Sequence, residues 1–262
     1  MSPALLLRSR STELRDRLAH WTRGALDLLY PPRCVGCGRH GSLFCAFCLA
    51  RVELLRPPVC QRCGRPVSVA GLCSFCRHTP SVLDGIRAAA IFAEPLRSAI
   101  HHFKYENRQA LAEPLTSLLQ ECWQRQPFPA DVLVPVPLHE RRLRERGYNQ
   151  AALLARELGR LLSLPVVEEA VRRERETRPQ VGLTAPERRE NVADAFHCSN
   201  GAMRGRRVLL IDDVCTTGAT LEACTAALRQ EGEAAAVWAL AVARPWGLDD
   251  GSSAAHHRPA QG

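Results

Sequence analysis

The stretch from residue 208 to residue 230 limits the possible folds more than any other part of the chain. Val208 to Ile211 are four consecutive apolar residues, which is typical of a short strand buried on both faces of a parallel sheet. Asp212 and Asp213 follow where this strand ends, and Leu221 to Gln230 has the pattern of a helix. A strand that passes through a tight turn into a helix indicates an α/β fold.

The turn between this strand and this helix has the composition of an anion-binding site. Backbone N–H groups point outward at a helix N-terminus, and the helix dipole favours negative charge there. Threonine hydroxyls add donors, and a glycine permits close approach to a phosphate. Two carboxylates beside the turn would repel a simple anion, so the ligand needs hydroxyl groups or Mg²⁺ at its other end. A ribose 5-phosphate meets both conditions. The turn consists of Cys215, Thr216, Thr217, Gly218, Ala219 and Thr220.

The whole stretch resembles the motif with which type I phosphoribosyltransferases bind phosphoribosyl pyrophosphate (PRPP). One alternative is an ordinary strand-to-helix turn with two solvated aspartates. A second is the acidic pair of receiver domains, but that pair lies on the first strand and has no Thr-Thr-Gly after it. Cys215 lies at a helix N-terminus, which predicts a lowered thiol pKa. The alternative for Cys215 is an inert filler whose backbone alone matters, and this is the favoured interpretation.

Eight of the twelve cysteines form four Cys-x-x-Cys pairs, which is the spacing of zinc knuckles. Disulfides are the alternative, but the sequence shows no export signal, and four regular pairs favour two structural Zn²⁺ ions. Sequential pairing would make two small ribbons and interleaved pairing a cross-brace. The spacing leaves both open, and we favour the sequential arrangement. The pairs are Cys34 and Cys37, Cys45 and Cys48, Cys60 and Cys63, and Cys73 and Cys76.

The formal charge of +8 does not by itself indicate nucleic-acid binding. Eight thiolates on two Zn²⁺ ions contribute −8 + 4 = −4, which leaves about +4. Almost all basic residues are arginine, as expected from a GC-rich genome, so the single lysine, Lys104, is a functional candidate. No apolar run reaches the length of a membrane span, and Leu5 to Leu7 is too short for a signal peptide. We therefore expect a cytoplasmic protein without membrane insertion.

The remaining periodicity predicts further strands and helices of the same α/β fold. The expected strands are Asp84–Ala93, Val132–Val136, Pro165–Val171 and Ala234–Ala243, and the expected helices start at Pro95, span Ala110–Trp123, and run from Gly147 to about Leu162. The segment Arg172–Asn191 is highly charged and long for a loop, which is typical of a lid or a disordered stretch.

A second ligand-binding loop is expected where the strand Val132–Val136 ends, because α/β sheets bind ligands at the carboxyl ends of their strands. Four arginines follow this loop and suit a pyrophosphate, although a solvated basic helix start is an equal alternative. The loop consists of Val136, Pro137, Leu138 and His139, and the arginines are Arg141, Arg142, Arg144 and Arg146.

An ordered set of short motifs resembles the ComF/GntX family. The set comprises the two cysteine clusters followed by Phe103-Lys104-Tyr105, Val134-Pro135-Val136-Pro137, Arg146-Gly147-Tyr148-Asn149-Gln150, Thr177-x-x-Gln180, Arg188-x-x-Asn191 and the Asp212-Asp213 loop. The resemblance implies a double zinc ribbon at 31–80 and a type I phosphoribosyltransferase domain at 82–246, between a helical segment at 1–30 and a disordered tail at 247–262. We expect the second domain to fold when the chain is cut near Ser81.

The resemblance also implies roles for these residues. Asp212 and Asp213 would bind the ribose, Thr216 to Thr220 the 5-phosphate, and Val136 to His139 the pyrophosphate with Mg²⁺. Lys104 and Arg146 complete the expected catalytic set. Family members are implicated in DNA uptake or gluconate use, and the sequence does not identify the acceptor. Three hypotheses follow: a phosphoribosyltransferase, a PRPP sensor without turnover, and a factor that handles single-stranded DNA with the DNA-uptake machinery.

Overall fold

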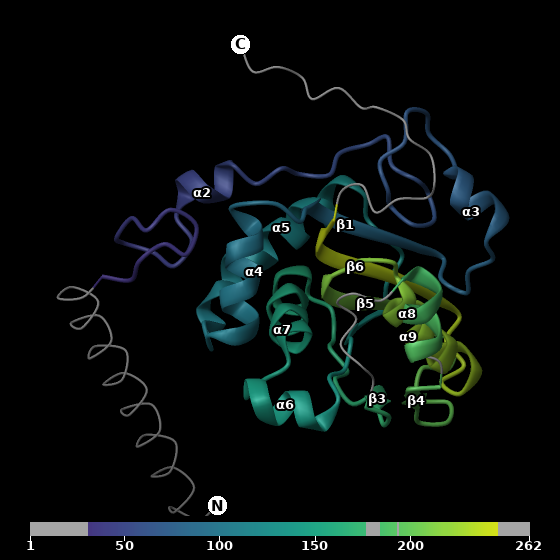
Figure 1. The fold of residues 1–262 in the computed structure, drawn as a ribbon. Helices are drawn as coiled ribbons and strands as arrows, with labels where there is room; N and C mark the ends of the chain where they lie inside the picture. Colours follow the sequence, from purple (N-terminus) through teal and green to yellow (C-terminus); the bar gives the residue numbers. More distant parts are fainter. Residues whose placement is uncertain (1–30, 177–183, 193, 246–262) are drawn as a thin grey trace, which may run out of the picture.

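The computed structural model describes residues 31–176, 184–192 and 194–245 (Figure 1). The expected helical segment at 1–30, the tail at 247–262, and the motif residues Thr177 and Gln180 lie outside the described residues. Within the described ranges, no helix is long and apolar enough to cross a membrane.

A parallel four-stranded sheet forms the centre of the molecule (Figure 1). The side chains from Val208 to Ile211 are fully buried, as expected for a strand with both faces covered. The α/β fold predicted from the sequence is therefore confirmed. In spatial order the strands are β1 (Gly85–Ile91), β6 (Ala236–Arg244), β5 (Arg207–Val214) and β2 (Val132–Pro135).

Alternate residues of β5 pack into two different layers of helices. Leu209 and Ile211 belong to a core shared with α4 (Leu96–Tyr105), α5 (Ala112–Arg125) and α7 (Gln150–Leu162). Val208 and Leu210 belong to a second core, shared with α9 (Ala219–Gln230). The short helix α8 (Ala185–Val192) contacts α9, and the turn η1 (Gln109–Leu111) leads into α5.

Two expectations about the middle of the chain are corrected. Only Val166 of the expected strand Pro165–Val171 bridges to β2, through Leu133, and the chain then leaves the sheet. It forms β3 (Val171–Arg173), which pairs antiparallel with β4 (Phe196–Cys198) as a separate small sheet. The expected strand Pro165–Val171 therefore does not become a fifth strand of the sheet, because its last residue, Val171, already pairs with Cys198 of β4.

The expected lid at 172–191 is also not one continuous loop, because it includes part of β3 and all of α8 except its last residue. Thr184 donates to Glu187 Oε2 through both its backbone nitrogen and its hydroxyl, at 2.7 and 2.6 Å. This Thr-x-x-Glu spacing is a helix-start signal that the charged composition obscured. A further helix, α6 (Glu140–Arg146), carries the four arginines that follow the loop after β2, in agreement with the alternative of a basic helix start.

The cysteine-rich part lies along the outer edge of β1, the edge that β6 does not occupy (Figure 1). Leu55 N donates to Ala89 O at 2.9 Å, and Ile91 N donates to Glu53 O at 2.8 Å. The helix α2 (Ala46–Ala50) belongs to the first cysteine cluster and α3 (Ser74–His78) to the second. The two clusters lie towards opposite ends of β1 in Figure 1.

Candidate active site

The eight paired cysteines form two separate clusters, each with its four Sγ atoms within 4.8 Å of one another. Sγ of Cys37 lies 3.6 Å from Sγ of Cys45, and Sγ of Cys63 lies 3.8 Å from Sγ of Cys73. A tetrahedral Zn²⁺ with bonds of about 2.3 Å separates its sulfurs by about 3.8 Å, so both clusters fit structural zinc. Sequential pairing is confirmed: the first two Cys-x-x-Cys pairs make one cluster and the last two make the other.

Backbone N–H groups donate hydrogen bonds to one cysteine sulfur in each cluster and favour its thiolate form. Cys45 N donates to Cys34 Sγ at 3.4 Å, and Cys73 N donates to Cys60 Sγ at 3.3 Å. Burial acts to raise the thiol pKa at both positions, but the backbone N–H donors outweigh it and lower the pKa of Cys34 and of Cys60 to about 6. Thiolates are the form that binds Zn²⁺.

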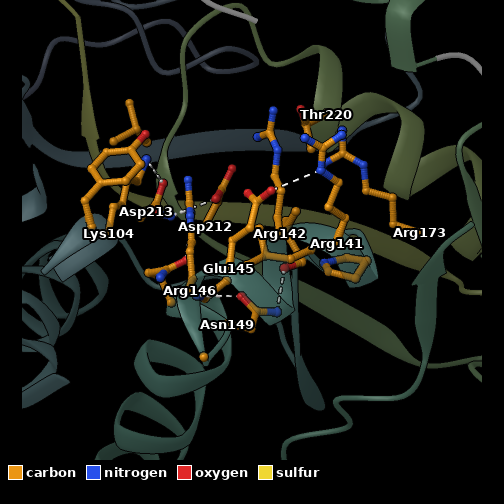
Figure 2. Close-up of a pocket in the computed structure, with 18 of the residues that line it drawn as sticks. Lys104, Arg141, Arg142, Glu145, Arg146, Asn149, Arg173, Asp212, Asp213 and Thr220 are labelled. Atoms are coloured by element: carbon orange, nitrogen blue, oxygen red, sulfur yellow. Dashed lines mark hydrogen bonds and ion pairs between the residues drawn. The ribbon is translucent and has the colours of Figure 1, made fainter. Parts of the chain in front are cut away.

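An open cleft of about 900 Å³ lies at the carboxyl ends of β2 and β5 (Figure 2). This is the edge at which a parallel sheet binds ligands. The cleft is lined by residues from α4, α6, α7, β3 and the two loops singled out in the sequence. Of the predicted site residues it brings together Lys104, Val136, Pro137, Leu138, Arg146, Asp212, Asp213, Thr216 and Thr220.

Asp212 and Asp213 lie beside the single lysine of the chain. Lys104 Nζ lies 2.8 Å from Asp213 Oδ1, and Asp213 N donates to Asp212 Oδ1 at 2.8 Å. Burial and the charge of Asp213 raise the pKa of Asp212 to about 7, against the opposing charge of Lys104. Asp212 therefore gains or loses a proton near neutral pH.

A tyrosine fixes the end of α4 that carries Lys104. The hydroxyl of Tyr148, which is 8% exposed, donates to the carbonyl of Phe103. The two rings also pack together, with centroids 5.9 Å apart. Phe103 is fully buried, so the residue after it is held at the mouth of the cleft.

The neighbours of Tyr148 connect three elements around the cleft. Gly147 ends α6 with φ +78°, a conformation that favours glycine. Asn149 accepts from Ala151 N at 3.0 Å to cap α7, and it donates to Val136 O at 3.0 Å. This second bond fixes the loop after β2. The motif from Arg146 to Gln150 is thus a junction that sets the shape of the site.

Arg146 is held on two sides. Its Nη1 donates to Gln150 Oε1 at 2.8 Å, and its guanidinium lies over the ring of Tyr105, 5.0 Å from the centroid. Such stacking fixes a planar cation without neutralising it.

The expected phosphate loop has the geometry of an anion site at a helix N-terminus. Gly218 caps α9 with φ +86°, and a Cβ at that position would lie 3.2 Å from Ile86 Cδ1. Thr217 Oγ1 accepts from Ala219 N at 3.4 Å, which shapes the turn from within. Thr216 and Thr220 line the cleft, so the loop presents residues from both of its ends.

Several expectations about individual site residues can be compared with the structure. Cys215 is 2% exposed, and burial raises the pKa of its thiol, which contradicts a lowered pKa and agrees with the favoured interpretation of Cys215 as an inert filler. His139 caps α6 by accepting from Arg141 N at 3.3 Å, and it does not line the cleft. Thr217, Gly218 and Ala219 do not line it either.

The arginines of α6 differ in what already holds them. Arg141 pairs with Glu145 at 3.0 Å and with Glu176 at 2.8 Å, and Arg144 pairs with Glu140 at 3.2 Å. Within the ranges that the structure describes, Arg142 has no carboxylate partner, which leaves its charge available to a ligand.

Arg173 is a cleft residue that the sequence analysis missed. It comes from β3 and lies near Arg142 on the Thr220 side of the cleft (Figure 2). Burial and the charge of Arg142 lower the pKa of Arg173, although it stays protonated at neutral pH. Two neighbouring guanidinium groups beside Thr220 make this end of the cleft electropositive. Nothing in the sequence distinguished Arg173 from the other arginines, because its position depends on β3 leaving the sheet.

Comparison with known proteins agrees with both parts of the structure. Residues 25–77 match the double zinc ribbon domain, and residues 105–252 match the phosphoribosyl transferase domain. Among solved structures, the glutamine PRPP amidotransferase of B. subtilis is similar with a TM-score of 0.38 and 18% identity. That similarity covers 53% of this chain and 30% of the other, which is too weak to carry an argument.

Three relatives are similar over most of this chain. DNA utilization protein YhgH of Escherichia coli is 35% identical over 64% of this chain and 76% of its own. Competence protein ComFC of Bacillus subtilis is 28% identical over 76% of this chain and 83% of its own. Competence protein F of Haemophilus influenzae is 34% identical over 84% of this chain and 95% of its own. With its two cysteine clusters, its phosphoribosyl transferase domain and these relatives, the chain belongs to the ComF family.

Proposed function

We propose that the cleft binds PRPP with Mg²⁺ and transfers its phosphoribosyl group to an acceptor, with release of pyrophosphate. The observation that carries this proposal is the meeting of an acidic pair and an anion site in one cleft. Asp212 and Asp213 lie near the end of β5, and the turn that leads from β5 into α9 contributes Thr216 and Thr220 to the same cleft. Few ligands other than a phosphorylated sugar need carboxylates and a phosphate site so close together.

In this proposal the two ends of the sugar phosphate bind to the two ends of the turn. The carboxylates of Asp212 and Asp213 accept from the 2- and 3-hydroxyls of the ribose. The backbone N–H groups between Thr216 and Thr220 receive the 5-phosphate at the N-terminus of α9. Lys104 orients Asp213 through their 2.8 Å ion pair.

The pyrophosphate would lie over the loop that follows β2, where Asn149 holds Val136. The guanidinium of Arg142 can stabilise its negative charge, and Arg146 offers a second, pre-oriented cation. Mg²⁺, when bound, would neutralise phosphate oxygens and help pyrophosphate to leave.

The proposed reaction breaks the bond between C1 and the pyrophosphate oxygen, and the leaving pyrophosphate keeps the electron pair. A nucleophilic atom of the acceptor then bonds to the electron-deficient C1 and loses its proton to solvent. The protein contributes orientation of the ribose and stabilisation of the departing charge, so no dedicated base is required.

Calorimetric titration with PRPP at millimolar Mg²⁺ tests the binding part. Replacing both aspartates, Asp212→Asn with Asp213→Asn, should weaken binding by roughly 10- to 100-fold, because hydrogen bonds to charged groups contribute about 1.5–3 kcal/mol. Arg142→Ala should weaken it by about tenfold. Arg160→Ala is the control: Arg160 on α7 is exposed, pairs with Glu157 at 2.6 Å and does not line the cleft, so its loss should change affinity less than about twofold. Wild-type protein that does not bind PRPP would end the proposal.

Pyrophosphate release, measured across a panel of nucleobases and small nucleophiles, separates an enzyme from a PRPP sensor. Release that depends on one acceptor class would identify the substrate. Binding without release under every condition would favour a sensor that reports PRPP.

A second candidate function is the handling of single-stranded DNA, which the names of the competence and DNA-utilization relatives favour. Strand binding at two salt concentrations tests it, because contacts to phosphates weaken as salt rises. Under this function, replacing Asp212 and Asp213 by asparagine should leave strand binding unchanged or slightly tighter. The free thiols of the cysteine clusters suit a reducing compartment, so we propose the cytoplasm as the location for either function.

A further inference from the structure

Arg244 is a buried cation at the carboxyl edge of the sheet. It is the last residue of β6, and its side chain is 4% exposed. Its backbone is fixed by pairing with Ile91 of β1 and by the bond from Phe92 N to Arg244 O at 2.7 Å. The direction in which its guanidinium reaches is therefore set by the sheet.

The guanidinium of Arg244 connects two segments that are far apart in the sequence. Nη1 donates to the carbonyl of Cys63, and Nη2 donates to Thr216 O at 3.4 Å. Cys63 belongs to the second cysteine cluster, and Thr216 begins the cleft-lining part of the phosphate loop. Burying a guanidinium without partners is costly, so the arrangement holds only while both carbonyls stay in place.

The same two segments also meet at Ile86. Ile86 N donates to Arg62 O at 2.6 Å, and a Cβ on Gly64 would lie 2.3 Å from Ile86 O. Only a glycine, here with φ +70°, lets the knuckle of the second cluster approach β1 so closely. On its other side, Ile86 packs against Gly218 of the phosphate loop.

The first cluster makes a different contact. A Cβ on Gly36 would lie 2.9 Å from Cβ of Pro95, so this cluster packs against the start of α4. Among the described residues, no hydrogen bond joins this cluster to Arg244 or to Ile86. The two clusters therefore offer a natural comparison within one chain.

We propose that Arg244 is a positioning residue that ties the phosphate loop to the second cysteine cluster, so that phosphate binding in the cleft depends on the metal in that cluster. This inference rests on the proposed function, because it takes the loop from Thr216 to Thr220 as the phosphate site. The metal fixes the turn that carries Cys63, the carbonyl of Cys63 fixes Arg244, and Arg244 fixes the first carbonyl of the loop. Loss of the metal frees that turn, since zinc knuckles are ordered by their ion.

A double-mutant cycle with ribose 5-phosphate as the probe tests the tie. The variants are Cys73→Ser in the second cluster, the equivalent Cys45→Ser in the first, and Arg244→Met, which keeps the length of the side chain without its donors. Calorimetry should show that Cys73→Ser and Arg244→Met each weaken binding on the order of tenfold, and that together they weaken it no further than either alone. Any effect of Cys45→Ser should instead multiply with that of Arg244→Met. Independent effects of Cys73→Ser and Arg244→Met would overturn the inference.

Hydrogen exchange without any ligand keeps the test independent of the proposed function. Removing zinc from the wild-type protein with a chelator should speed exchange at the amides from Cys215 to Ala219, and Arg244→Met should already show the fast rate. Arg244→Lys keeps the charge but reaches only one carbonyl, so its exchange should be intermediate. If wild-type protein binds neither ribose 5-phosphate nor PRPP, the proposed function fails while the exchange result still decides the tie. Unchanged exchange on chelation would refute the tie, and the chelator experiment also replaces Cys73→Ser if that variant does not fold.

Discussion

Lys104, in the last turn of α4, forms a 2.8 Å ion pair with Asp213, near the end of β5. The pair is mostly buried, with side-chain exposures of 20% and 11%. It joins the helix layer to the acidic pair, and it gives the only lysine in the chain a specific partner. The last turn of α4 therefore places a positive charge beside the two aspartates of the cleft.

Replacing Lys104 by methionine should raise the pKa of Asp212 further, because the charge of Lys104 lowers that pKa. PRPP binding should weaken at pH 7, and the pH at which binding reaches half its maximum should move upward. Titrations at several pH values measure both effects. Lys104→Arg is the control, since it keeps the charge. A midpoint that stays in place in Lys104→Met would contradict the role given to this lysine.

The raised pKa of Asp212 also predicts how PRPP binding depends on pH. Ligand hydroxyls and Mg²⁺ need the ionised carboxylate, so affinity should fall by up to about tenfold for each pH unit below 7. Asp212→Asn should bind more weakly but lose this dependence. A wild-type affinity that is constant from pH 5 to pH 8 would rule the assignment out.

The raised pKa of Asp212 should also make the stability of the protein depend on pH in a defined direction. Asp212 holds its proton more tightly in the folded chain, where its pKa is about 7, than in the unfolded chain, where it is near 3.8. The free energy of unfolding should therefore fall as pH rises from about 4 to about 7, and this contribution should be constant outside that window. Denaturant melts of wild type and Asp212→Asn across pH isolate the difference. Asp212→Asn should raise the free energy of unfolding more at pH 8 than at pH 5, relative to wild type. The opposite order would contradict the assignment.

Each of the two clusters should bind one zinc ion independently of the other. We expect about two zinc ions for each chain, and about one in Cys34→Ser or Cys73→Ser. Elemental analysis of freshly purified, reduced protein gives the count. Zinc-free protein that keeps its fold would contradict a structural role for the metal.

Tyr148→Phe should reveal how the motif around Tyr148 supports the site. Removing the hydroxyl leaves the carbonyl of Phe103 without its buried donor, which should cost about 1 kcal/mol of stability. Because Lys104 follows Phe103, PRPP binding should weaken as well. Tyr105→Phe provides a comparison, since Tyr105 is 62% exposed and should not change stability. Equal melting midpoints for both variants would contradict the argument.

The sequence predicted those parts of the fold that local patterns determine. The run from Val208 to Ile211 is apolar because both of its faces are covered, and the turn after Asp213 has a composition that few other structures need. The cysteine spacing likewise predicted two sites of four cysteines, although it left open which pairs combine.

What the sequence did not predict depends on contacts between distant segments. Arg173 reaches the cleft only because β3 pairs with β4, and no local pattern distinguishes it from its neighbours. For Cys215 the sequence left an activated thiol and an inert filler as alternatives, and only the packing of the core, which buries the thiol and raises its pKa, decides for the filler. The ion pair of Lys104 is another long-range contact, although the scarcity of lysine indicated that the residue was special.

The cover on the outer edge of β1 changes what fragment of this protein can be studied. Glu53, Leu55 and Arg62 bond to the backbone of β1 at its exposed side, and Leu55 belongs to the hydrophobic core. A fragment that begins near Ser81 would lose this cover, so the structure argues against the expectation that such a fragment folds well alone. Its uncovered strand would offer unpaired N–H and C=O groups to any neighbouring molecule, and edge-to-edge aggregation would follow. The cysteine-rich part thus protects the edge of the sheet from pairing with other molecules, and fragments for crystallisation should retain it.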